Sequence, residues 1–98
     1  IVFVVDSSDR ERVELAGDEL RSMLKYDELK DAVVLIYANK QDLPNAMDCS
    51  EIVHKMGLNQ LRSNNPWNVQ ACSAQSGHGL YEGINSLNSL IQKKRAQK

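Results

Sequence analysis

The sequence predicts an α/β fold in which three parallel strands alternate with three helices. Two continuous apolar runs, residues 1–5 and 32–38, lack the period-two alternation of a half-buried strand, as central parallel strands do. Each run is followed by a segment whose apolar residues recur at steps of three and four, which is typical of a helix packed on one face. Because strand and helix alternate, the connections imply right-handed crossovers and a parallel sheet with helices on both faces.

The first strand, residues 1–5, is expected to be buried on both faces. Ser8 and Glu11 then match the S-x-x-E capping box, in which each side chain accepts a hydrogen bond from the other residue's free backbone N–H. The first helix is therefore expected to begin there and to end near Lys25. Its predicted buried stripe consists of Val13, Ala16, Leu20, Met23 and Leu24.

The second strand, residues 32–38, is likewise predicted to be covered on both faces. Asp48 and Glu51 can cap a short second helix, and Gly57 stands where a left-handed residue would end it. Residues 66–72 are predicted to form a third strand, although their strand pattern is weaker than that of the first two. A loop of small residues then leads to a last helix, whose predicted buried positions are Leu80, Ile84, Leu87 and Ile91.

Composition excludes several classes of protein. The chain has 98 residues, so it holds one domain at most. Its 12 basic and 13 acidic residues give a net charge of -1, which does not favour nucleic acid as a partner. Its longest apolar run is far shorter than the roughly 20 residues that a membrane-spanning helix needs. Neither its cysteines nor its histidines show the spacing of a metal site or a catalytic centre, so we expect neither.

In parallel α/β sheets, ligands bind at the carboxyl ends of the strands. That rule points to three loops, residues 6–9, 39–42 and 73–77. Residues 39–42 read N-K-Q-D and match N-K-x-D, a pattern of guanine recognition. The alternative interpretation of the same loop is an ordinary polar turn.

The side chains of this loop offer the hydrogen bonds that guanine needs. The two oxygens of Asp42 match the adjacent donors of guanine, N1–H and the exocyclic amine. Such charge-assisted bonds are each worth about 1.5–3 kcal/mol, and adenine lacks the donor pair, so specificity follows. Asn39 can donate an amide hydrogen to N7 or O6, and the stem of Lys40 can cover the base with its ammonium in water. In the loop after the third strand, the backbone N–H of Ala74 can reach O6.

Three stretches, residues 4–12, 38–47 and 76–83, are similar to those of the ADP-ribosylation factor (Arf) family. Nearly the whole chain resembles the second half of a Ras-like small GTPase, and most closely this family. Residues 73–75 read S-A-Q where Arf proteins usually have C-A-T, which preserves the backbone contact but assigns no role to the third side chain. The base-contacting residues that the resemblance implies are Asn39, Lys40, Asp42, Ser73, Ala74 and Gln75.

The resemblance also implies which part of a domain this is. Residues 1–98 are expected to be the guanine-binding, C-terminal portion of a single P-loop small GTPase domain, with a partial doubly wound parallel sheet. The pattern G-x-x-x-x-G-K-[ST] does not occur, and the chain opens on an apolar run without Met. We therefore expect the phosphate-binding half, with its Mg²⁺ site, to lie upstream, and we do not expect this chain alone to hydrolyse GTP.

For the intact protein, the resemblance implies a switch between GDP and GTP in vesicle trafficking. Its expected partners are exchange factors, GTPase-activating proteins, coat proteins and effectors, in the cytoplasm and at Golgi or other endomembranes. Membrane attachment is expected only through the missing N-terminal segment. The alternative is a truncated, non-catalytic chain without nucleotide activity, which acts at most as a protein-interaction module.

Overall fold

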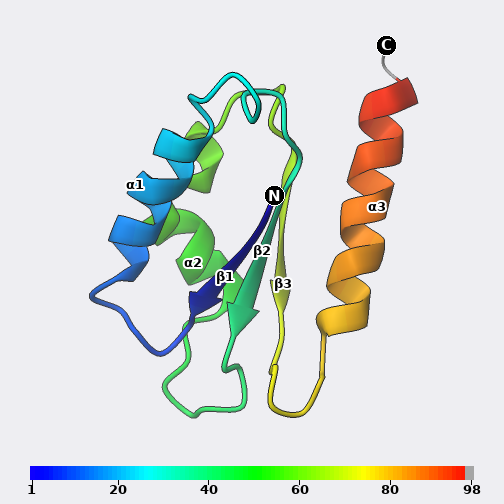
Figure 1. Cartoon of the computed structure of the whole chain (residues 1–98). Coiled ribbons are helices and arrows are strands. Elements are labelled where there is room, and N and C mark those ends of the chain that lie inside the picture. The colour runs from blue at the N-terminus through cyan, green and yellow to red at the C-terminus, as the bar shows by residue number, and fades with distance from the viewer. Residues whose placement is uncertain (97–98) are drawn as a thin grey trace.

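The computed structural model of the chain describes residues 1–96, so the last two residues of the predicted domain lie outside it. Its strands are all parallel and lie in the order β1-β2-β3, as Figure 1 shows. The predicted α/β class and the alternation of three strands with three α-helices are confirmed. The elements are β1 (Val2–Asp6), α1 (Val13–Met23), β2 (Val34–Asn39), α2 (Cys49–Met56), the short 3₁₀ helix η1 (Leu58–Gln60), β3 (Trp67–Ala71) and α3 (Leu80–Ala96).

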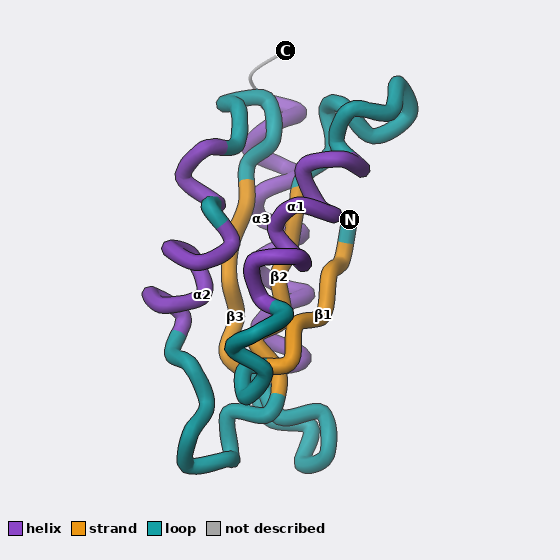
Figure 2. Tube along the Cα trace, turned by 90° about the vertical axis from the view of Figure 1, so that its left-hand side faces the viewer, coloured by secondary structure: helices purple, strands orange, loops and turns teal. Residues whose placement is uncertain are grey.

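Helices cover the sheet from both sides. Helices α1 and α2 lie on one face and α3 lies on the other, and Figure 2 views the sheet from the α1–α2 side. The central strand β2 alternates between the two layers: Val34 and Ile36 pack in the α1–α2 core, whereas Leu35 and Tyr37 pack beneath α3. All of these side chains are buried, as predicted for residues 32–38. A strand buried on both faces explains a run without alternation.

Strand β1 corrects the expectation that residues 1–5 are buried on both faces. Val2 and Val4 are 49% and 60% exposed. Their register partners on β2 are Leu35 and Tyr37, so they share the face on which α3 packs. Helix α3, however, lies over β2 and β3, whereas β1 lies at the opposite edge of the sheet from β3. An apolar run therefore reports that a strand can be buried, while the neighbouring elements decide whether it is.

Helix α1 starts later than the capping box predicts. It begins at Val13, and its N-cap, Arg12, makes no side-chain capping bond. The backbone N–H and the hydroxyl of Ser8 both donate to Oδ1 of Asp6, at 2.9 and 2.6 Å. Because Ser8 is engaged in this Asx-type turn, it does not cap a helix, and the predicted Ser8–Glu11 box does not form. The end of α1 at Met23 is close to the predicted one.

The later elements follow the sequence more closely. Asp48 caps α2 by accepting the backbone N–H of Glu51, and Gly57 ends the helix in the left-handed region at φ 68°. In α3 the predicted buried position Ile84 is instead 45% exposed. The backbone of Gly83 lies against the ring of Tyr37, where an added Cβ would come within 2.4 Å of a ring carbon. This close approach places Gly83, rather than Ile84, against the sheet.

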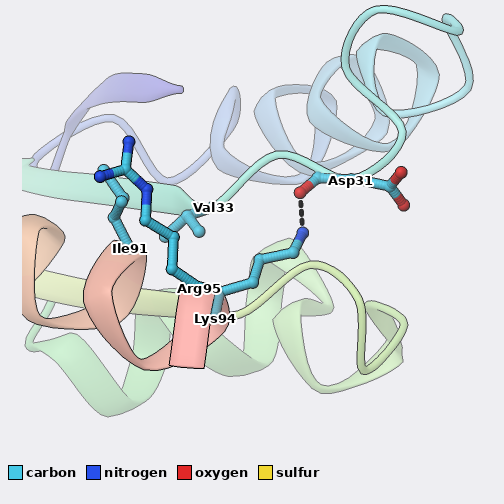
Figure 3. A pocket seen from close by; sticks show the side chains of 5 residues that line it. All are labelled: Asp31, Val33, Ile91, Lys94 and Arg95. Atoms are coloured by element: carbon cyan, nitrogen blue, oxygen red, sulfur yellow. Dashed lines mark hydrogen bonds between the residues drawn. The ribbon is translucent and has the colours of Figure 1, made fainter. Parts of the chain in front are cut away.

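At the amino end of the sheet, side-chain donors hold the loops together. The ammonium of Lys94 donates to the backbone oxygen of Asp31, as Figure 3 shows, and to that of Asn64 at 2.6 Å. The buried amide of Asn65 donates to the backbone oxygens of Lys30 and Ala32, at 3.0 and 2.9 Å. The Lys94 bonds join α3 to the loops that precede β2 and β3, and the Asn65 bonds join those two loops to each other. Within residues 1–96, no helix has the length and apolarity needed to cross a membrane.

Candidate functional site

The three loops predicted to bind a ligand meet at the carboxyl end of the sheet, at the arrowheads in Figure 1. Backbone hydrogen bonds connect them across the strands. The N–H of Ser7 donates to the oxygen of Asn39 at 3.2 Å, and the N–H of Gln41 donates to the oxygen of Cys72 at 3.1 Å. The N–H of Met47 returns to the oxygen of Ser7 at 2.8 Å. The loops after β1, β2 and β3 therefore form one surface.

A hollow of about 330 Å³ opens in this surface. Every residue that the sequence predicts for guanine contact lines it, together with Leu43, which the sequence analysis did not select. Leu43 is 40% exposed and adds an apolar patch to a polar rim. The complete lining is Asn39, Lys40, Asp42, Leu43, Ser73, Ala74 and Gln75.

Asn39 is oriented by two donors from the loop after β3. Its Oδ1 accepts the backbone N–H of Ala74 at 2.9 Å and the thiol of the buried Cys72 at 3.7 Å. The amide oxygen faces these donors, and the Nδ2 group makes no hydrogen bond within residues 1–96, so it can donate to a ligand. The same contact engages the Ala74 N–H that we expected to reach guanine O6, so that donor is shared with Asn39.

The ammonium of Lys40, which is expected to lie in water, also has a partner on β1. Its Nζ forms an ion pair with Oδ2 of Asp6 at 2.8 Å, although the Lys40 side chain is 51% exposed. The hydrogen bond from Lys40, supported by those from Ser8, lowers the pKa of Asp6 to about 2. The same pair raises the pKa of Lys40. The sequence placed Asp6 in a ligand loop but gave no signal of this pairing.

Gln41 occupies the variable position of the N-K-x-D pattern, and its side chain supports the loop through hydrogen bonds to buried residues. Its Nε2 donates to the hydroxyl of Ser7 and to the backbone oxygen of Met47, each at 2.8 Å. Both Ser7 and Met47 are fully buried. The amide thus satisfies buried oxygen atoms and fixes the turn between β2 and α2. This contribution was missed because a variable position in a binding pattern carries no signal of burial.

Asp42 is the exposed acid of the hollow. Its carboxylate makes no hydrogen bond and no ion pair with any other residue in the 1–96 range. Both oxygens are therefore available to a ligand that presents two donors. Across the same described range, no three histidine, cysteine or acidic side chains are grouped to hold a metal ion. The hollow offers an open acceptor pair and an amide donor, which suit a neutral planar ligand with donors beside an acceptor.

Comparisons with known proteins identify the family and the fold. The model of the ADP-ribosylation factor family matches residues 1–91. Among solved structures, the Arl6 BBS3 small GTPase from Trypanosoma brucei, with a bound nucleotide analogue GppNp, superposes with a TM-score of 0.86 at 29% sequence identity. The match covers 95% of this chain and 58% of that one. The fold is that of a small GTPase with part of the sheet, and the chain belongs to the ADP-ribosylation factor family.

Proposed function

We propose that this chain is the guanine-recognition part of a GDP/GTP switch that acts in vesicle trafficking. The observation that carries the proposal is that the unpaired carboxylate of Asp42 lines the same hollow as Asn39, whose amide oxygen is already engaged by the Ala74 N–H. Family membership supports a guanine nucleotide as the ligand. The solved relative was captured with the nucleotide analogue GppNp, which supports binding of the triphosphate form.

The proposed contacts follow from the donors and acceptors that the hollow offers. Asp42 accepts guanine N1–H and the exocyclic amine, and the Nδ2 of Asn39 donates to N7 or O6. The methylene stem of Lys40 covers one face of the base. Ala74 contributes its backbone N–H to O6 as a bond shared with Asn39, and Ser73 and Gln75 complete the rim.

Hydrolysis and regulation are proposed for the intact protein rather than for this chain. The chain spans 58% of the length of the solved relative, and its sequence has no P-loop pattern. We assign the phosphates and Mg²⁺ to residues outside it, where a P-loop would supply backbone donors and a lysine. Exchange factors, GTPase-activating proteins, coat proteins and effectors are the proposed partners, in the cytoplasm and at Golgi or other endomembranes.

The test exchanges the acceptor pair of Asp42 for one acceptor and one donor. In protein made from the full coding sequence, Asp42→Asn should lose preference for GDP and gain preference for xanthosine diphosphate, whose base carries a carbonyl in place of the amine. Loss of two charge-assisted bonds predicts a fall in GDP affinity of about 100-fold or more. Competition against a fluorescent nucleotide measures both values.

Asp9→Asn is the matched control, because Asp9 pairs with Arg12 and does not line the hollow. It should leave the ratio of GDP to xanthosine diphosphate affinity unchanged. An Asp42→Asn protein that keeps its guanine preference would contradict the role given to Asp42. A native protein that binds no guanine nucleotide would overturn the proposed function and favour a protein-interaction module.

A further inference from the structure

We infer that Asp6 is a positioning residue of the base site, which holds the stem of Lys40 in place before the nucleotide binds. The inference rests on the proposed function, because it concerns the same hollow. It adds a residue that lies outside the N-K-x-D pattern and outside the lining of the hollow. The evidence is a chain of contacts from β1 to the loop after β2.

Both carboxylate oxygens of Asp6 are engaged. Oδ1 accepts the backbone N–H and the hydroxyl of Ser8, at 2.9 and 2.6 Å, and Oδ2 accepts from the ammonium of Lys40 at 2.8 Å. Two bonds from one neighbouring residue fix the plane of the carboxylate. The remaining oxygen then meets Lys40 in one orientation, so the ammonium is held at a defined place rather than at any point that a free lysine could reach.

Asp6 also stands on a rigid part of the sheet. It is the last residue of β1 and the register partner of Asn39 on β2. The backbone of the next residue, Ser7, donates to the oxygen of Asn39. The anchor of Lys40 is therefore set by strand pairing and moves with the side chain that is proposed to donate to the base.

The backbone of Lys40 adopts a conformation that few residues other than glycine adopt. Its φ is 62°, and in the part of the chain that the structure describes it is the sole residue other than glycine with a positive φ. This left-handed conformation is unfavourable for a residue with a long side chain. It turns the chain out of β2, and the ion pair with Asp6 is the hydrogen-bonded contact that the structure shows for the ammonium.

Loss of Asp6 should affect nucleotide binding in a different way from loss of Asp42. A methylene stem packs on the face of any flat base, so it contributes affinity without selecting the base. Holding the stem in its bound position lowers the ordering cost of binding. Loss of Asp6 should therefore weaken binding of every purine nucleotide that the site accepts by the same factor, whereas loss of Asp42 should change which base is preferred.

A double-mutant cycle on the native protein, made from the full coding sequence, tests this inference. The variants are Asp6→Asn, Lys40→Met and the double variant, and the readout is the dissociation rate of fluorescent GDP and fluorescent inosine diphosphate. Removing the preorganising contact should speed release of both nucleotides by a similar factor, about 2- to 5-fold for Asp6→Asn. In the Lys40→Met background, Asp6→Asn should have no further effect, because the group that it positions is gone.

Glu51→Gln is the matched control, because it breaks an exposed ion pair of similar length, Glu51–Arg10 at 2.7 Å, away from the hollow. It should leave both dissociation rates unchanged. Should Asp6→Asn prevent folding, Ser8→Ala replaces it, since this variant removes one of the bonds that orient Asp6 and keeps the carboxylate. Ser8→Ala should speed release of both nucleotides by about 2-fold.

An equal effect of Asp6→Asn with and without Lys40 would overturn the inference, because Asp6 would then act through the fold. So would unchanged release in both the Asp6 and Ser8 variants, or a change in the GDP-to-inosine diphosphate ratio. The Asp42→Asn competition separates the two ideas. A switch of base preference with no Asp6–Lys40 coupling removes this inference alone, whereas a native protein without guanine binding removes both.

Discussion

The two ends of the sheet use polar side chains in opposite ways. At the amino end, Asn65 and Lys94 donate hydrogen bonds to backbone oxygens of neighbouring loops. These bonds hold the loops of that end together. At the carboxyl end, Asn39 and Lys40 are also tied to neighbouring loops, but the exposed Asp42 pairs with no residue in the described range 1–96. The difference teaches that the polar side chains at the amino end serve the fold alone, whereas the carboxyl end also leaves one acid, Asp42, unpaired within residues 1–96, and this is the group that we propose binds a ligand.

The largest stability effect should come from the amino end. Asn65→Ala removes the donors to Lys30 and Ala32 from a side chain that is 3% exposed. Leaving those oxygens without their partner should lower the free energy of unfolding by about 1–3 kcal/mol. Urea denaturation measures the loss, and the exposed Ser63→Ala serves as the neighbouring control. The proposed preference for guanine should be the same in this variant as in the native protein, and a changed preference would mean that the two ends of the sheet are coupled.

A smaller loss of stability is expected from a substitution at Lys94. Lys94→Met keeps the apolar stem beside Val33 and Ile91 but removes the bonds to Asp31 and Asn64. The loss should be about 1 kcal/mol, because the ammonium is partly exposed and its bonds compete with water. Thermal unfolding measures it. The adjacent Arg95→Met is the control, and an equal loss there would show that charge at the end of α3, rather than the bonds of Lys94, stabilises the fold.

The smallest effect should appear as a pH dependence at the carboxyl end. The pKa of Asp6 falls from its ordinary value of 3.8 to about 2 in the folded protein, mainly through the bond from Lys40. Because the folded pKa is the lower one, the ion pair stabilises the fold fully above pH 4, and this contribution is lost as the pH falls toward 2. Between pH 5 and pH 2, Asp6→Asn should therefore lose less stability than the native sequence. Parallel pH profiles of the two proteins would contradict the assignment.

Much of the fold could be predicted from local patterns. The cap at Asp48 and the left-handed Gly57 depend on a few neighbouring residues, and both formed as expected. The burial of β1 and the start of α1 depend on distant elements. Val4 is exposed because α3 covers β2 and β3, and Ser8 fails to cap a helix because Asp6 accepts its bonds. A short stretch of sequence shows neither the position of α3 nor the hydrogen bonds of Asp6.

The site could be predicted in part for the same reason. Its lining residues come from two short patterns at the ends of neighbouring strands, and the rule for parallel sheets places those ends together. The supports of the site are not in the patterns. The bond from Gln41 to Ser7 and the pairing of Lys40 with Asp6 each join residues that lie far apart in the chain. They depend on the register of β1 against β2, which could not be predicted from the sequence.

An NMR titration of the ¹⁵N-labelled protein with guanosine and adenosine monophosphates tests most directly whether the carboxyl end of the sheet recognises guanine. The open acceptors of Asp42 and the donor of Asn39 predict that guanosine monophosphate shifts the backbone amides of residues 39–42 and 73–75, and that adenosine monophosphate shifts them far less. Signals at the amino end, such as that of Asn65, should not move. Equal shifts with both nucleotides, or shifts confined to the amino end, would contradict the claim that the carboxyl end of this sheet recognises guanine.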